Sequence, residues 1–143
     1  MITRRGEFNF RGTRQQFERF RSRIPLLVAN ESRNHFLEGF RRGGGQTDRS
    51  RGGWPARRPP RSERQARRDS GRALLVLSGN MRSDIRVRGV SFRRSVINVV
   101  NIPYARYHNN GTDRIPQREF IGRSRALEGK IIRLIERELQ NIN

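Results

Sequence analysis

The sequence predicts an α+β fold, in which a small antiparallel β-sheet built from a hairpin packs against an N-terminal kinked helix pair and a C-terminal amphipathic helix, with a long extended arm. Three patterns in the chain predict this fold. Apolar residues recur every three or four positions near both ends, Val- and Ile-rich segments lie between these regions, and a stretch rich in Gly, Pro and Arg interrupts the order. We expect an N-terminal extended arm over residues 1–12 and a single domain over 13–143, with 43–72 inserted in it as an arm or loop.

The composition limits both the core and the partners. Of 143 residues only 32% are hydrophobic, so the core must be small, and partner subunits would add stability. Lysine and arginine total 32 against 13 acidic residues, and Lys130 is the only lysine. Arginine pairs with phosphates and with carboxylates at interfaces, so a nucleic-acid partner and an acidic protein partner both stay open. The absence of cysteine excludes disulfides and thiolate metal sites, and we expect no cofactor.

No segment of the sequence predicts membrane insertion. The longest apolar runs, 24–29 and 73–77, are far too short to cross a bilayer. The charged N-terminus is not followed by an apolar run of signal-peptide length. We therefore expect no membrane partner.

The N-terminal arm carries Phe8 and Phe10 at alternating positions. This spacing suits one face of a strand that lies against a neighbouring subunit. A frayed terminus accounts for the same residues, and both interpretations stay open.

A helical region follows from Thr13, a suitable N-cap, to a stop at Gly43. Pro25 interrupts it, and either begins a second helix at its first turn or kinks one long helix. The apolar face shifts slightly after the proline, which favours a break or bend. His35 has no second metal ligand near it in the sequence, so we expect a packed or surface histidine. The apolar residues of this region are Phe17, Phe20, Ile24, Leu27, Ala29, Phe36, Leu37 and Phe40.

Residues 43–72 differ from the rest in composition, with six glycines, three prolines and nine arginines against three acidic residues. Such a stretch cannot bury enough apolar surface to fold alone, so we expect an arm that becomes ordered against something else. Trp54, the only tryptophan, lies at its centre and suits a pocket on the body or on a neighbour. A solvated insertion with a tucked tryptophan is the alternative.

Strand signals follow the arm. We expect Leu74, Leu75 and Leu77 to form a helical turn or short helix that docks on the core and ends at 78–80. The alternation after Asp84 and the Val- and Ile-rich run 95–102 predict an antiparallel hairpin with its turn between Gly89 and Arg94. In this hairpin Ile85 and Val87 should face inward, and Arg86 and Arg88 outward.

The stretch 99–122 is dense in residues that fix the backbone. Pro103 suits the first position of a short helix, and Asn110-Gly111 suits its stop. Ile115-Pro116 requires extended backbone, which predicts a return strand before Gly122. From about Ser124 a last helix carries Leu127, Ile131, Ile135, Leu139 and Ile142 on one stripe.

His108, Asp113, Tyr104 and Tyr107 are capable of acid-base chemistry. However, the chain offers no nucleophile elbow, no P-loop and no second histidine near His108, so we expect a structural role and no enzyme. We expect Tyr104 and Tyr107 to bury their rings while their hydroxyls, with His108 and Asn109, satisfy loop backbone. Pro116, Arg118 and Phe120 would hold the return strand so that its edge faces a neighbour.

The ordered motifs resemble the phage virion morphogenesis family, the tail-completion proteins of Mu-like and P2-like tailed phages with related neck and connector components. Ser78 stands where that family usually has Thr, and Met81 where it usually has Leu. The resemblance covers roughly residues 13–143. The residues that carry it are Phe40 with Trp54; Leu75, Ser78, Gly79, Met81, Ser83 and Ile85; Tyr104, Ala105, His108 and Gly111; and Pro116, Arg118, Phe120, Ile121 and Gly122.

The resemblance implies a structural virion protein that forms an oligomeric ring at the head-tail neck or tail end and is assembled in the host cytoplasm. Its partners would be copies of itself and adjacent neck, connector or tail proteins, with double-stranded DNA passing through. The arms would clasp adjacent subunits, and the expected interface residues are Trp54, Phe8, Phe10, Arg57 and Arg58.

The alternative is a nucleic-acid-binding module whose arm grips DNA phosphates. A dedicated DNA-binding protein would concentrate charge on one helix or stripe, whereas here arginine is spread over the chain, which favours the ring subunit. The arm arginines in this alternative are Arg57, Arg58, Arg61, Arg64, Arg67 and Arg68, of which the last four are the expected phosphate contacts.

Overall fold

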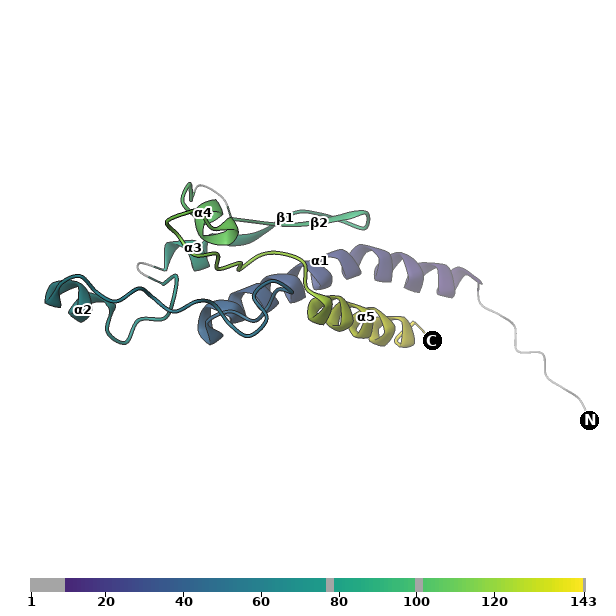
Figure 1. Cartoon of the computed structure of the whole chain (residues 1–143). Coiled ribbons are helices and arrows are strands. Elements are labelled where there is room, and N and C mark those ends of the chain that lie inside the picture. Colours follow the sequence, from purple (N-terminus) through teal and green to yellow (C-terminus); the bar gives the residue numbers. More distant parts are fainter. Residues whose placement is uncertain (1–9, 77–78, 100–101, 143) are drawn as a thin grey trace, which may run out of the picture.

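The computed structural model describes residues 10–76, 79–99 and 102–142. It shows an α+β fold with a long N-terminal helix, a two-stranded antiparallel hairpin and a C-terminal helix packed on the long helix. The long helix lies between the hairpin on one side and the C-terminal helix on the other (Figure 1). In chain order the elements are α1 (Phe10–Arg42), α2 (Glu63–Asp69), α3 (Asn80–Ser83), β1 (Ile85–Ser91), β2 (Arg94–Val99), α4 (Ala105–Asn110) and α5 (Arg125–Gln140).

Helix α1 runs without a break through Pro25, so the second of the two interpretations, one long helix, is confirmed and the two-helix interpretation is wrong. Pro25 is buried under the hairpin, where Ser95 Oγ donates a hydrogen bond to its carbonyl oxygen at 3.2 Å. The helix begins at Phe10, so the extended arm expected over 1–12 is wrong for its last three residues. Residues 1–9, with Phe8, lie outside the described part of the chain.

The hairpin has the expected turn, because Phe92 and Arg93 connect β1 and β2 between Gly89 and Arg94. The inward and outward assignments are also confirmed: Ile85 is fully buried and Val87 partly buried, whereas Arg86 and Arg88 are exposed. Arg33 of α1 donates from Nε to the carbonyl oxygen of Ile85 at 2.9 Å, which fixes β1 on the long helix.

The core is centred on the C-terminal half of α1. Phe40 is 1% exposed, and its ring centroid lies 5.5 Å from those of both Trp54 and Phe120. Segments far apart in the sequence thus meet on one phenylalanine. The buried members of this cluster are Phe40, Trp54, Met81, Ile85, Ala105 and Phe120.

The segment before the hairpin differs from the expectation. Leu74 and Leu75 form a turn and not a helix, because Leu75 adopts a φ of 60°, which a right-handed helix does not allow. The short helix α3 instead begins at Asn80, after Gly79 has turned the chain with a φ of 79°. Leu77 and Ser78 lie outside the described residues.

The stretch 43–72, expected as an inserted arm or loop, has two parts in the structure. Its first part, 43–56, packs on the body: Trp54 N–H donates to the Gly43 carbonyl at 2.7 Å, and Asp48 N–H donates to the Arg123 carbonyl at 2.7 Å. Its second part, 57–72, carries α2 away from the body (Figure 1). We call residues 57–72 the arginine arm.

Candidate functional sites: the corner and the arginine arm

The residues from α4 to the start of α5 form a compact corner. Gly111, with a φ of 75°, ends α4, and a Cβ there would lie 3.0 Å from Gln117. The chain then turns back, with Thr112 N–H donating to the Ile115 carbonyl at 2.8 Å and Arg118 N–H to the His108 carbonyl at 2.8 Å. The two sequence blocks on which the resemblance depends therefore lie against each other.

Asn109 joins these two blocks through its side chain. Its Oδ1 accepts hydrogen bonds from the backbone N–H groups of Phe120 and Ile121, each at 3.0 Å, and its Nδ2 donates to the Ile121 carbonyl at 3.0 Å. The expectation that Asn109 satisfies loop backbone is confirmed. The prediction of a return strand is wrong, because residues 116–121 form no strand. The backbone N–H groups of Arg118, Phe120 and Ile121 donate to the His108 carbonyl and to Asn109 Oδ1, so they are not free to pair with a neighbour.

The two tyrosines of the corner do not bury their rings as expected. Tyr104 is 44% exposed and Tyr107 is 40% exposed, because α4 is short and only Ala105 of it is buried. The Tyr107 hydroxyl accepts a hydrogen bond from Arg106 at 2.7 Å, and the Arg106 guanidinium lies 4.8 Å from the Tyr107 ring centroid. These aromatic groups therefore face solvent at the surface of the corner.

His108 is half-buried, and burial followed by the charge of Arg118 lowers its pKa from the ordinary value of 6.5. Its Nδ1 is buried without a hydrogen-bond partner in the described part of the chain. The structure shows no hydrogen bond between His108 and Asp113, and Asp113 is exposed. Of the acid-base groups named from the sequence, the Tyr104 and His108 rings lie edge to face with centroids 6.2 Å apart, but Asp113 does not join them.

The corner also holds the base of the arginine arm. Arg118 is buried, as expected of a structural residue, and donates from Nε to the Pro55 carbonyl and from Nη2 to the Ala56 carbonyl, both at 2.9 Å. Trp54 Nε1–H donates to the Glu119 carbonyl at 2.9 Å. Since Trp54 is only 8% exposed, its assignment to a subunit interface is corrected: it fills a pocket on its own body.

Arg57 makes the second set of contacts at this base. Its guanidinium donates to three backbone carbonyls: from Nη1 to Asp69 at 3.0 Å and Arg72 at 2.9 Å, and from Nη2 to Ala73 at 2.7 Å. These bonds join the two ends of the arm and give Arg57 a structural role, while its expected place at a subunit interface stays a prediction. Burial, and then the nearby Arg57 charge, lower the pKa of Arg118.

Helix α2, in the middle of the arm, has a well-formed N-terminus. Ser62 is the N-cap, its Oγ accepting from Gln65 N–H at 3.2 Å, while Gln65 Oε1 accepts from Arg61 N–H at 3.0 Å. No residue of α2 is buried. The helix is therefore stabilised by its N-cap and by the Arg57 hydrogen bonds that join the two ends of the arm.

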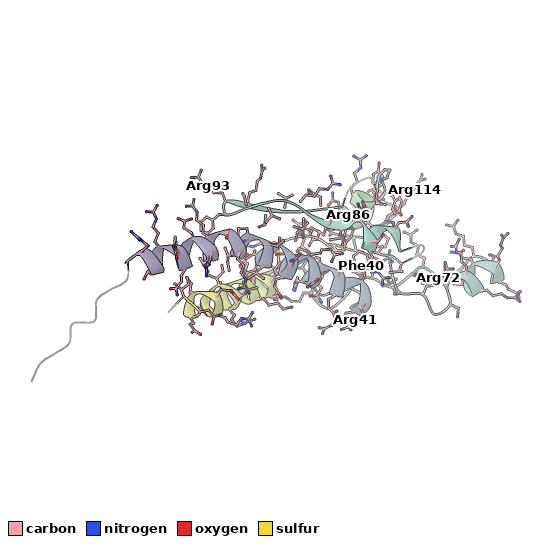
Figure 2. The ribbon with its side chains drawn as sticks, turned by 180° about the vertical axis from the view of Figure 1, so that it is seen from behind. Phe40, Arg41, Arg72, Arg86, Arg93 and Arg114 are labelled. Carbon is pink, nitrogen blue, oxygen red and sulfur yellow. The ribbon has the colours of Figure 1, made fainter. Side chains whose placement is uncertain are left out.

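The arm arginines differ in their ion pairs. Arg67 lies 3.9 Å from Glu63, and Arg68 lies 3.1 Å from Asp69, whose pKa this hydrogen bond lowers. Within the described residues no ion pair or side-chain hydrogen bond involves the guanidinium groups of Arg58, Arg61 or Arg64. Elsewhere the arginines are spread over the body: Arg41, Arg86, Arg93 and Arg114 belong to different parts of the chain (Figure 2).

A buried polar cluster that the sequence did not predict links α1 to α5. His35 is 3% exposed, and its Nε2–H lies 2.7 Å from the Gln46 carbonyl oxygen and 3.0 Å from Ser124 Oγ. Lys130 Nζ lies 3.3 Å from His35 Nδ1. Of the two positions expected for His35, packed or surface, the structure shows the packed one. Ser124 was expected to start the last helix, and it does cap α5, but no pattern predicted its contact with His35.

The remaining signature residues have structural positions. Ala105 is 5% exposed in the core, Pro116 is partly buried, and a Cβ at Gly122 would lie 2.5 Å from the Glu119 carboxyl carbon. Phe10 is the first residue of α1. In the described ranges the structure shows no group of three or more metal-ligating side chains, and no helix there is long and apolar enough to span a membrane.

Comparisons with protein-family models, with curated proteins and with solved structures found no match.

Proposed function

We propose that this protein is a structural virion protein of a tailed phage or prophage, forming an oligomeric ring at the head-tail neck or tail end. The resemblance of the sequence motifs to the phage virion morphogenesis family supports a ring as the kind of assembly. The observation that carries the self-association is a group of exposed apolar side chains at one end of the molecule.

We call this group the apolar end, and define it as Phe17 of α1, Val90 and Phe92 of the hairpin, and Leu139 of α5. Their exposed fractions are 47%, 37%, 52% and 44%. The N-terminal half of α1, the hairpin turn and the C-terminus of α5 lie at the same end of the fold (Figure 1). Two contacts agree with this placement: the Arg21 guanidinium lies 5.4 Å from the Phe92 ring centroid, and Arg23 lies 3.6 Å from Glu138.

The exposed end belongs to a chain with a small core, in which eleven apolar residues are buried among those described. Burial of further apolar area against a neighbouring subunit would add stability that one chain alone cannot supply. Neighbouring elements that expose apolar groups together are typical of a protein-protein contact surface. In the ring, the apolar end of one subunit would pack on the next.

The test is the assembly state of the full chain, measured by sedimentation velocity and light scattering, alone and with neck and tail proteins. We expect an oligomer that Phe17→Gln together with Leu139→Gln shifts toward monomer. The matched control is Leu26→Gln, because Leu26 is 52% exposed and lies on the opposite side of α1, about 180° around the axis from Phe17. A chain that stays monomeric in all these mixtures would contradict the proposal.

A further inference from the structure

The arginine arm is a mounted element and not a loose tail. Arg118 of the body holds the chain just before the arm through the carbonyls of Pro55 and Ala56, and Arg57 joins the two ends of the arm through the carbonyls of Asp69, Arg72 and Ala73. The adjacent prolines 59 and 60 stiffen the segment of the arm that leads to α2. The arm therefore presents α2 away from the body at a defined place (Figure 1).

The arginines of α2 lie on one side of the helix. At 3.6 residues per turn, Arg64, Arg67 and Arg68 fall within about 100° of one another around the axis. All three are exposed, with the side chain of Arg67 85% and that of Arg68 55% accessible. Helix α2 is about 10 Å long, the length over which one DNA strand carries about three phosphates.

A second copy of this chain is a poor charge partner for the arm. Most of its carboxylates already pair with arginines of the same chain, and Glu119 is buried. Among the described acidic residues, only Glu18, Glu31, Asp113 and Glu136 have neither an ion pair nor a buried position. Each added copy would also bring more positive charge than negative.

An acidic protein is also disfavoured. The arm, 57–72, holds seven arginines and two acidic residues, but its only apolar residues are Ala66 and two prolines. Protein-protein interfaces depend on buried apolar or aromatic anchors, which this arm lacks. Binding to a phosphate backbone requires only placed charges and no such anchor.

The absence of aromatic residues from the arm separates two kinds of nucleic acid. Single strands are held largely by stacking of their bases on aromatic side chains, and residues 57–72 contain none. A duplex presents its phosphates at higher charge density and needs no stacking. We infer that the arginine arm binds the phosphate backbone of double-stranded DNA without sequence preference, with Arg64, Arg67 and Arg68 of α2 as the contacting residues.

The experiment measures binding of the full chain to a short labelled DNA duplex of mixed sequence by fluorescence anisotropy over a series of salt concentrations. The arm variant carries Arg64→Gln, Arg67→Gln and Arg68→Gln. The control variant carries Arg14→Gln, Arg133→Gln and Arg137→Gln, which removes the same charge from exposed positions on α1 and α5. Circular dichroism shows that each variant is folded before binding is measured.

We expect the arm variant to lose about tenfold or more in affinity at 0.1 M salt and to bind with a salt slope shallower by about 2 to 3. The control should lose much less, and a triple lysine variant at the same arm positions should retain most of the binding, because a phosphate accepts any cation. Equal losses in the arm and control variants would show that only net charge matters and would overturn the inference. Tighter binding to a single strand of the same length would overturn the assignment to duplex DNA. Neither outcome depends on the assembly state, so the inference can fail while the proposed ring stands.

Discussion

Lys130 Nζ lies 3.3 Å from Nδ1 of His35, at a ring whose other nitrogen faces the Gln46 carbonyl oxygen at 2.7 Å. The carbonyl can only accept and the ammonium can only donate, so the ring is neutral with its proton on Nε2. Burial lowers the pKa of His35 from 6.5, and the charge of Lys130 lowers it further, against the opposing effects of the Gln46 hydrogen bond and Glu31. The neutral His35 ring thus lies at the contact between α1 and Lys130 of α5.

The free energy of unfolding should therefore fall as the pH drops below about 6.5. Both histidines have a lowered pKa in the folded chain, so below 6.5 the unfolded chain binds protons that the folded chain does not. Their contribution is complete above 6.5 and decreases with falling pH until the folded pKa values are passed. Urea unfolding at a series of pH values measures this change.

Single glutamine variants at His35 and His108 separate the two contributions. Each substitution should reduce the pH dependence, and the double variant should remove most of it between about pH 7 and pH 5. Lys130→Met should weaken the effect of His35 only in part, because burial is the larger cause of its shift. A double variant with an unchanged pH dependence would show that other groups produce it.

Asn109→Ala should destabilise the fold by about 2–4 kcal/mol, because it leaves the N–H groups of Phe120 and Ile121 without an acceptor in a partly buried place. Asn109→Asp keeps an acceptor for both groups and loses only the bond to the Ile121 carbonyl, so it should cost less. Urea unfolding of both variants gives the comparison. A larger loss for Asp than for Ala would contradict the role given to Oδ1.

The elements with a clear period could be predicted from the sequence. The turn of the hairpin and the N-cap of α5 at Ser124 follow from local chemistry, namely alternation and a capping side chain. The lack of a second ligand near His35 argued against a metal site, but it left a packed and a surface position equally open. The sequence could not decide between one helix and two at Pro25, since a proline can stand in the first turn of a helix or kink a longer one.

Contacts between distant residues account for the other errors. The composition of 43–72 predicted an arm, but nothing local indicated that Trp54 would meet Phe40 and the Glu119 carbonyl. Arg57 looked like any other arm arginine, and only the fold brings it to three carbonyl oxygens. The number of arginines in 57–72 therefore predicted a basic arm. The structure shows which of them, Arg57, holds the arm together and that its other arginines, such as Arg64, are exposed.

Arg57→Gln should loosen the arm and leave the body folded. Loss of its three bonds to carbonyl oxygens frees the segment 69–73 that follows α2, so amide hydrogen exchange in α2 should become faster. The matched control is Arg58→Gln, because Arg58 is exposed and its side chain makes none of these bonds. Exchange in α2 that is equally fast in both variants would contradict the mounting role of Arg57.

Gly44→Ala should destabilise the chain more than Gly45→Ala. Both glycines have a positive φ, 106° and 85°, so an alanine at either position carries backbone strain of about 1–2 kcal/mol. A Cβ at Gly44 would also lie 2.7 Å from the Trp54 ring and backbone nitrogen, whereas at Gly45 it would meet nothing within 4 Å. The clash would push Trp54 away from Phe40, and the total cost at Gly44 should reach about 3 kcal/mol or more.

Thermal unfolding followed by tryptophan fluorescence measures both effects, since Trp54 is the only tryptophan and its emission should shift to the red in Gly44→Ala alone. Equal destabilisation of the two variants, with no shift in emission, would show that Trp54 does not pack against this turn.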